Sequence, residues 1–109
     1  KIENAQFAID QKQWSDSIYH AYASIVNAAK ALLISEGKKT NTHGGIIKDF
    51  DTHFVESDII ELPTSFSTFV NQINQNTPSK EFALNYLEGA KSFVKRIENY
   101  REEQLNTVV

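Results

Sequence analysis

Apolar residues recur with helical spacing along most of the chain. In the longest such stretch they are separated by three, four or seven positions: Ile18, Tyr22, Ile25, Val26, Ala29, Leu32 and Leu33. This spacing gathers side chains on one face of a helix. No stretch shows the strict alternation of apolar and polar residues that is typical of a half-buried strand. The pattern therefore predicts an all-α protein.

Helix start and stop signals divide the chain into five predicted helices. These lie at about 2–11, 16–36, 42–55, 65–73 and 78–105. We expect Ser15 or Asp16 to cap the second helix and Gly37 to end it. Pro78 suits the first turn of the last helix, because its missing N–H would be unpaired there in any case. Five helices without a sheet predict an antiparallel up-and-down four-helix bundle with one additional short helix.

The second predicted helix carries no Asp, Glu, Lys or Arg between Asp16 and Lys30. Such a helix lacks an ordinary solvent face, so it is either the centre of the bundle or one side of an interface. Along it runs a stripe of small and mildly polar residues, which we call the small-residue stripe: His20, Ser24, Asn27 and Ala31. A subunit interface and a core whose polar groups are satisfied within one chain both fit this stripe.

The composition is typical of an ordinary soluble domain, and we do not expect it to bind nucleic acid. The chain has 109 residues, of which 40% are apolar and 23% are charged, and its size is that of a single domain, residues 1–109. Eleven basic and fourteen acidic residues give a net charge of −3, the opposite of the usual balance in a duplex nucleic-acid binder. No run is long and apolar enough for a membrane span, and no signal peptide is visible, so we expect a cytoplasmic protein without a membrane partner.

Two residue types are missing altogether. Without cysteine, this chain has no disulfide, thiolate zinc site or iron–sulfur ligand, and we expect no cofactor within the domain. Without methionine, even at position 1, the sequence predicts a domain excised from a longer protein.

The segment Thr42-His43-Gly44-Gly45 is the most suggestive local site. Two glycines in the first turn of a helix leave backbone N–H groups open to an anion such as a phosphate. Lys38 and Lys39, close by in sequence, would add positive charge. The alternative is structural: Thr42 caps the helix, His43 bonds locally, and the glycines allow close packing. The structural alternative is favoured, because a lone Gly-Gly is a weak phosphate signal.

A metal site is a weaker hypothesis for the third predicted helix. Asp49, His53 and Glu56 are spaced four and three residues apart, so a regular helix would place them on one face. That face lies opposite Phe50 and Phe54, where a solvated polar stripe is expected anyway. The solvated stripe is the favoured interpretation, and no metal site is favoured.

Three segments together resemble the HEPN domain family. They are the small-residue-rich helix YHAYASIVNAAKALLISEG, the Thr-His pair followed by IIKDFDTHFV, and the closing helix AKSFVKRIENY. The resemblance covers about residues 14–100 and is closest to the HEPN-like domains at the C-terminal end of bacterial sirohaem sulfite or nitrite reductases. It implies a four-helix bundle that often pairs through its helices. In a reductase parent, sirohaem and an iron–sulfur cluster would belong to the other domains.

The chain departs from the pattern of the ribonucleases in this family, which use Arg followed a few residues later by His. His20, His43 and His53 all precede Arg96 and Arg101, the only arginines. We therefore expect no catalytic residues in this domain. The sequence predicts an accessory module that forms a homodimer or docks to other domains of its parent protein. The alternative is a nucleotide-binding module with a nucleotidyltransferase partner, and a toxin-type ribonuclease is disfavoured because no imidazole follows an arginine.

Overall fold

A computed structural model describes residues 2–106 of the chain, and within them all regular structure is helical. The elements are α1 (Ile2–Asp10), α2 (Trp14–Ser35), α3 (His43–Phe50), the π-helix η1 (Asp51–Val55), α4 (Phe66–Asn71), the 3₁₀-helix η2 (Gln72–Asn74) and α5 (Lys80–Asn106). The predicted all-α class is confirmed, and each of the five predicted helices has a counterpart.

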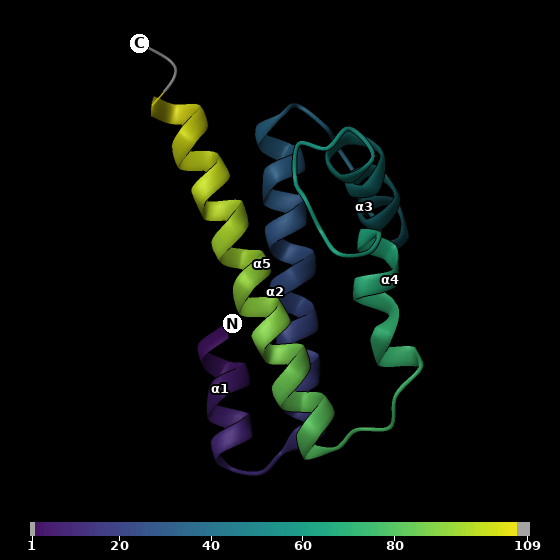
Figure 1. Ribbon diagram of the computed structural model, residues 1–109, viewed down its shortest axis with the longest axis vertical. Helices are drawn as coiled ribbons and strands as arrows, with labels where there is room; N and C mark the ends of the chain where they lie inside the picture. The colour runs from purple at the N-terminus through teal and green to yellow at the C-terminus, as the bar shows by residue number, and fades with distance from the viewer. Residues whose placement is uncertain (1, 107–109) are drawn as a thin grey trace.

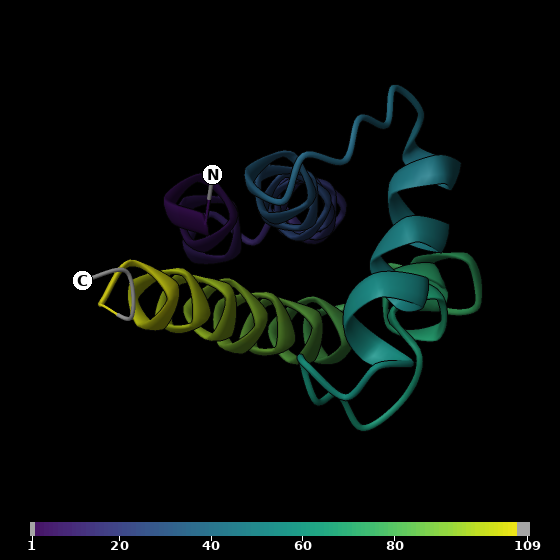
Figure 2. The ribbon, with the colours of Figure 1, turned by 90° about the horizontal axis from the view of Figure 1, so that it is seen from above.

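The helices form an up-and-down bundle with one helix lying across it. Figure 1 shows α1 and α4 running in one direction and α2 and α5 in the other. The short helix α3 lies across the bundle axis, as the view from above shows (Figure 2). The predicted four-helix bundle with an additional short helix is thereby confirmed.

Helix α2 is the centre of the bundle. It packs against α1, α3, α4 and α5. Seven of its apolar side chains are buried, and so are the side chains of Ser17 and Ser24. The Ser17 hydroxyl donates to the Ala5 carbonyl oxygen of α1 at 2.9 Å, so this buried group is paired across two helices.

The end of α2 follows the prediction, whereas its start does not. Gly37 has φ of +78°, and the N–H groups of Gly37 and Lys38 donate to Ile34 and Leu33 at 3.0 and 2.9 Å. This is the glycine-ended pattern expected from sequence. At the other end α2 begins at Trp14 without a side-chain cap, so the prediction of Ser15 or Asp16 as N-cap is wrong. Backbone bonds in the turn after α1 set that start instead, among them Gln13 N–H to Ala8 at 2.8 Å.

The last helix also begins later than predicted. Pro78 precedes α5 and does not lie in its first turn, because Ser79 takes the capping role. The Ser79 hydroxyl oxygen accepts from the Phe82 N–H at 3.1 Å. The start of α4 is as expected, since Ser65 caps it by accepting from the Thr68 N–H at 3.0 Å.

The third predicted helix is not regular. It changes at Asp51 into the π-helix η1, in which each turn holds an additional residue. The Asp51 carboxylate reaches the start of α4 and accepts from the N–H groups of Phe66 and Ser67 at 2.6 and 2.9 Å. The wide turn and this contact join η1 to α4.

Aromatic rings fill the core between α3, α4 and α5. Phe50 lies at the centre, with ring centroids 4.5 Å from Phe66, 5.1 Å from Phe54 and 5.4 Å from Phe93. Phe69 and Tyr86 extend the group towards the start of α5. We call these rings the ring cluster, and they hold α3, η1 and α4 against the long helices.

Candidate functional site

Three polar groups of the Thr42–Gly45 segment, the Thr42 hydroxyl, the Gly45 N–H and His43 Nδ1, are bonded within the chain. The Thr42 hydroxyl oxygen accepts from the Gly45 N–H at 3.0 Å, which makes Thr42 the predicted N-cap of α3. The Tyr22 hydroxyl and His43 Nδ1 are 3.0 Å apart, so His43 ties α3 to α2. This arrangement is the structural alternative foreseen from sequence, and it occupies groups that an anion would otherwise use.

The two glycines of this segment are not equivalent. A Cβ at Gly45 would lie 2.5 Å from Thr40 Cγ2 and 3.0 Å from Thr42 Oγ1, whereas a Cβ at Gly44 would meet nothing within 4 Å. Gly45 is therefore required for close packing. The side chains of Lys38 and Lys39 are exposed on the connection before α3.

The three candidate metal ligands do not come together. The Asp49 carboxylate accepts from the Thr40 hydroxyl at 2.8 Å, and so has a structural partner. His53 lies within η1 and Glu56 follows it, where the π-helical turn changes the spacing that a regular helix would give. Among residues 2–106, no three His, Asp or Glu side chains are grouped as a metal ion would need.

The small-residue stripe of α2 divides into a covered and an open part. Ser24 is buried, and its hydroxyl donates to the His20 carbonyl oxygen at 2.9 Å, so the core interpretation holds for this residue. His20 is half-buried with its ring beside Tyr19, Ala31 is half-buried, and Asn27 is exposed. The stripe is thus partly core and partly surface.

Of the open part, Asn27 lines a hollow between α2, α5 and the start of α1. This hollow is lined by Ile2, Glu3, Ser24, Asn27, Ala28 and Val94. A second hollow lies further along the same two helices, lined by Leu32, Ser35, Glu36, Tyr100, Arg101, Gln104 and Leu105. We call these two hollows together the α2–α5 groove. Burial, followed by the Glu36 carboxylate, raises the pKa of Tyr100 at its far end.

Two large apolar side chains are exposed at this end of the molecule. Ile34 of α2 is 56% exposed and Leu105 of α5 is 74% exposed. Ile34 continues the helical spacing of Asn27 and Ala31 along α2. Apolar side chains beside an uncharged stripe are typical of a protein–protein contact.

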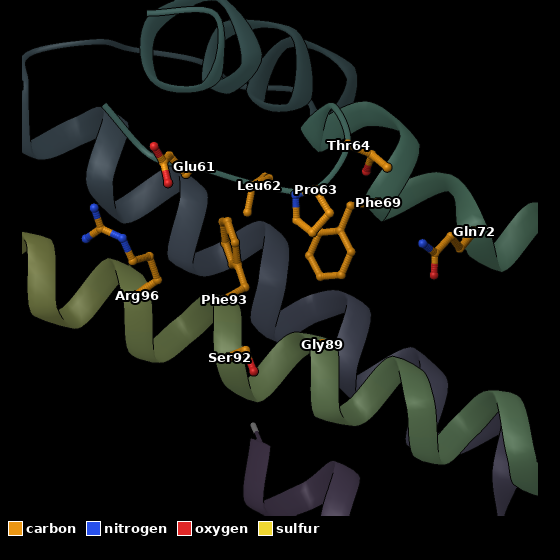
Figure 3. Close-up of a pocket in the computed structure, with 10 residues that line it drawn as sticks. All are labelled: Glu61, Leu62, Pro63, Thr64, Phe69, Gln72, Gly89, Ser92, Phe93 and Arg96. Atoms are coloured by element: carbon orange, nitrogen blue, oxygen red, sulfur yellow. The ribbon is translucent and has the colours of Figure 1, made fainter. Parts of the chain in front are cut away.

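A cavity of about 410 Å³ lies elsewhere, between α5, α4 and the connection that precedes α4 (Figure 3). Its lining is mostly apolar, with polar side chains at the rim: Glu61, Leu62, Pro63, Thr64, Phe69, Gln72, Gly89, Ser92, Phe93 and Arg96. The sequence pattern did not indicate this cavity, because Phe69 and Phe93 lie at apolar helical positions of the kind that normally fill a core. The one available signal was Gly89, a glycine inside an otherwise uninterrupted helical pattern.

Within residues 2–106, no helix is both long enough and apolar enough to cross a membrane.

Comparisons with known proteins identify the family. A model of the HEPN domain family matches residues 1–105. The UPF0332 protein PH1297 of Pyrococcus horikoshii is 39% identical over 61 residues, which are 56% of this chain and 43% of that protein. The Putative toxin MJ0605 of Methanocaldococcus jannaschii is 29% identical over 111 residues, which cover 95% of this chain and 83% of that protein. No solved structure matches. Since the family model spans nearly the whole sequence, the chain belongs to the HEPN domain family.

Proposed function

We propose that this HEPN domain is a non-catalytic accessory module that docks through the open face of α2 around Asn27, beside the α2–α5 groove. Its partner is a second copy of the chain or another domain of a larger protein. The observation that carries the proposal is the open half of the small-residue stripe, with exposed Asn27 next to Ala31 and Ile34 on a helix that is otherwise central. Burying this surface against a partner would remove apolar area from water without burying a charge of the stripe.

The chemistry of the histidines supports a role without RNA cleavage. His43 shares a hydrogen bond with Tyr22, and His53 lies in η1. Both arginines lie on α5, and all three histidines precede them in sequence. A general acid and base for cleavage must act on the same phosphate, and the Arg-then-His order used by the family's ribonucleases is missing here.

The docking proposal is tested by placing a charge in the open stripe. Asn27→Glu is expected to weaken self-association by at least about tenfold in sedimentation equilibrium, since it buries an unpaired carboxylate. Asn99→Glu, the same change at another exposed position, is the control and leaves association unchanged. Both variants should melt like the wild-type chain.

A wild-type chain that stays monomeric at high concentration would remove the homodimer form of the proposal. The docking form then requires that Asn27→Glu, and not Asn99→Glu, releases the domain from its parent protein. If neither substitution changes either measurement, this face of α2 has no docking role.

A sulfite or nitrite reductase is the parent that we propose, on the resemblance noted from sequence. It predicts that the native polypeptide recovered with an antibody to this domain is several times larger and shows sirohaem absorption. A small colourless polypeptide would instead favour a free-standing domain with a nucleotidyltransferase partner. In that case saturating nucleotide, at about 100 times its dissociation constant, should stabilise the domain by about 2.7 kcal/mol.

A toxin is the second candidate, and the name of the M. jannaschii relative is the observation that favours it. It predicts that expression of this chain arrests bacterial growth. If the arrest comes from RNA cleavage with His43 as acid or base, His43→Ala abolishes both. Growth that continues normally during strong expression would exclude this candidate.

A further inference from the structure

We propose that the cavity between α4, α5 and residues 61–64 binds an extended peptide segment of a partner protein, which inserts one large apolar side chain. This site is separate from the α2–α5 groove, and the two proposals share no residue.

The floor exists because position 89 has no side chain. Gly89 lies in the middle of α5, where glycine is a poor helix former compared with alanine. A Cβ there would lie 3.1 Å from Phe69 Cε1, so a larger residue would require a small shift of the Phe69 ring, which lines the cavity. The helix thus carries a poor helix former, Gly89, at the floor of the cavity.

The walls are apolar and largely fixed by the core. Phe93 and Phe69 belong to the ring cluster, and their centroids are 5.8 Å apart. Leu62 and Pro63 face them from the connection before α4 (Figure 3). At about 410 Å³ the space lies at the lower end of the range for binding pockets, which suits a single bulky group better than a large cofactor.

The rim offers donors and acceptors at both ends. Figure 3 shows Glu61 and Arg96 at one end of the cavity and Thr64 and Gln72 at the other. Within residues 2–106 no ion pair joins Glu61 to Arg96, and the Arg96 guanidinium makes one long hydrogen bond, to the Ile59 carbonyl oxygen at 3.4 Å.

The Glu61 carboxylate beside the Arg96 guanidinium favours a neutral ligand group that can both donate and accept a hydrogen bond. The hydroxyl and amide at the other end can do the same. A peptide backbone presents N–H and C=O groups on both sides of each side chain, so a peptide matches this rim better than a free acid or amine.

The first test is a titration of ¹⁵N-labelled protein followed by amide chemical shifts. The probes are N-acetyl-leucinamide and N-acetyl-phenylalaninamide, with phenylacetate, phenylethylamine and guanosine for comparison. We expect saturable shifts at Gly89, Ser92 and Gln72, with millimolar affinity, and binding of the blocked amino acids about tenfold tighter than that of phenylacetate or phenylethylamine.

Three variants locate the binding. Ser92→Leu fills the cavity from α5 and should abolish the shifts. Gly89→Ala should weaken binding while the melting temperature stays the same or rises, because the helix gains a better residue and Phe69 has room to move. Arg96→Gln should weaken binding of the blocked amino acids, whereas Lys95→Gln, the neighbouring loss of charge on the exposed side, should not.

Several outcomes would overturn the proposal. One is the absence of saturable shifts with any probe, and another is shifts that persist in Ser92→Leu. If phenylacetate or phenylethylamine bound as tightly as the blocked amino acids, the cavity would be an apolar hollow that does not recognise the peptide backbone. Tighter binding of guanosine would assign the cavity to a nucleobase.

Discussion

At the scale of single residues, Tyr86 shows how burial creates a dependence on pH. Its ring lies in the ring cluster, and its hydroxyl donates to the Val70 carbonyl oxygen at 3.2 Å. Burial, and secondarily the nearby Tyr22, raises the pKa of Tyr86 above its usual value. The folded state therefore keeps a proton that the unfolded chain releases near pH 10.

The sign of the effect follows from this difference. The contribution of Tyr86 to the free energy of unfolding is fully present below pH 10 and is lost as the pH rises above it, by up to about 1.4 kcal/mol per pH unit. Tyr86→Phe should lower stability by about 1 kcal/mol at pH 7, because a hydrogen bond is lost, and should flatten the decline above pH 10. Urea unfolding between pH 8 and about pH 11 measures the free energy of unfolding and its dependence on pH. Exposed Tyr19→Phe is the control, and equal slopes for wild type and Tyr86→Phe would contradict the assignment.

At the scale of elements, sequence predicted several helix ends that a residue of the same helix sets, but not the contacts between distant segments. Thr42 and Gly37 act on their own helices, and both were predicted. Asp51 lies 15 residues from the Phe66 N–H that it binds, so no local pattern could indicate its role. The same holds for η1, because the sequence 46–55 has an ordinary helical stripe and the wide turn arises where Asp51 meets α4.

Removal of the Asp51 carboxylate should destabilise α4 in particular. Asp51→Ala leaves two N–H groups at the start of α4 without their acceptor, and we expect a loss of about 1–2 kcal/mol in the free energy of unfolding. The loss of stability for Asp51→Asn should lie between zero and that for Asp51→Ala, since the amide oxygen can accept from one of the two N–H groups. Hydrogen exchange of α4 amides should accelerate more than that of α2.

The control for Asp51→Ala is Asp10→Ala, since the exposed Asp10 carboxylate accepts from the Gln6 side chain at 3.1 Å. Exposed pairs of this kind contribute a few tenths of a kcal/mol. A loss for Asp51→Ala no greater than for Asp10→Ala would show that the contact is incidental.

At the scale of the whole molecule, the chain consists of a frame and a cap. The frame is α1, α2 and α5, and the cap is α3, η1 and α4, which the ring cluster attaches (Figure 2). Sequence predicted the frame well, because α2 and α5 are long and periodic. The cavity could not be predicted, because it forms where Leu62 and Pro63, from an irregular connection, pass over α5.

Phe50 is the residue on which attachment of the cap most depends. Phe50→Ala should lower the free energy of unfolding by about 3–5 kcal/mol, through lost burial and a cavity among the rings. Hydrogen exchange should show α3 and α4 losing protection before α2 and α5. Phe7→Ala, at a side chain that is 65% exposed, is the control and should change stability by a few tenths of a kcal/mol. Simultaneous loss of protection in all helices would show that the cap is not a separate cooperative unit.

The unequal glycines at the start of α3 have a consequence for evolution. A substitution at position 44 adds a Cβ that meets no neighbour within 4 Å. Such substitutions can therefore accumulate during evolution and change the surface beside His43. At position 45 even one added carbon would come within 2.5 Å of Thr40 Cγ2, so a change there requires the Thr40 side chain to move or to become smaller. Two neighbouring identical residues are therefore free to diverge at very different rates.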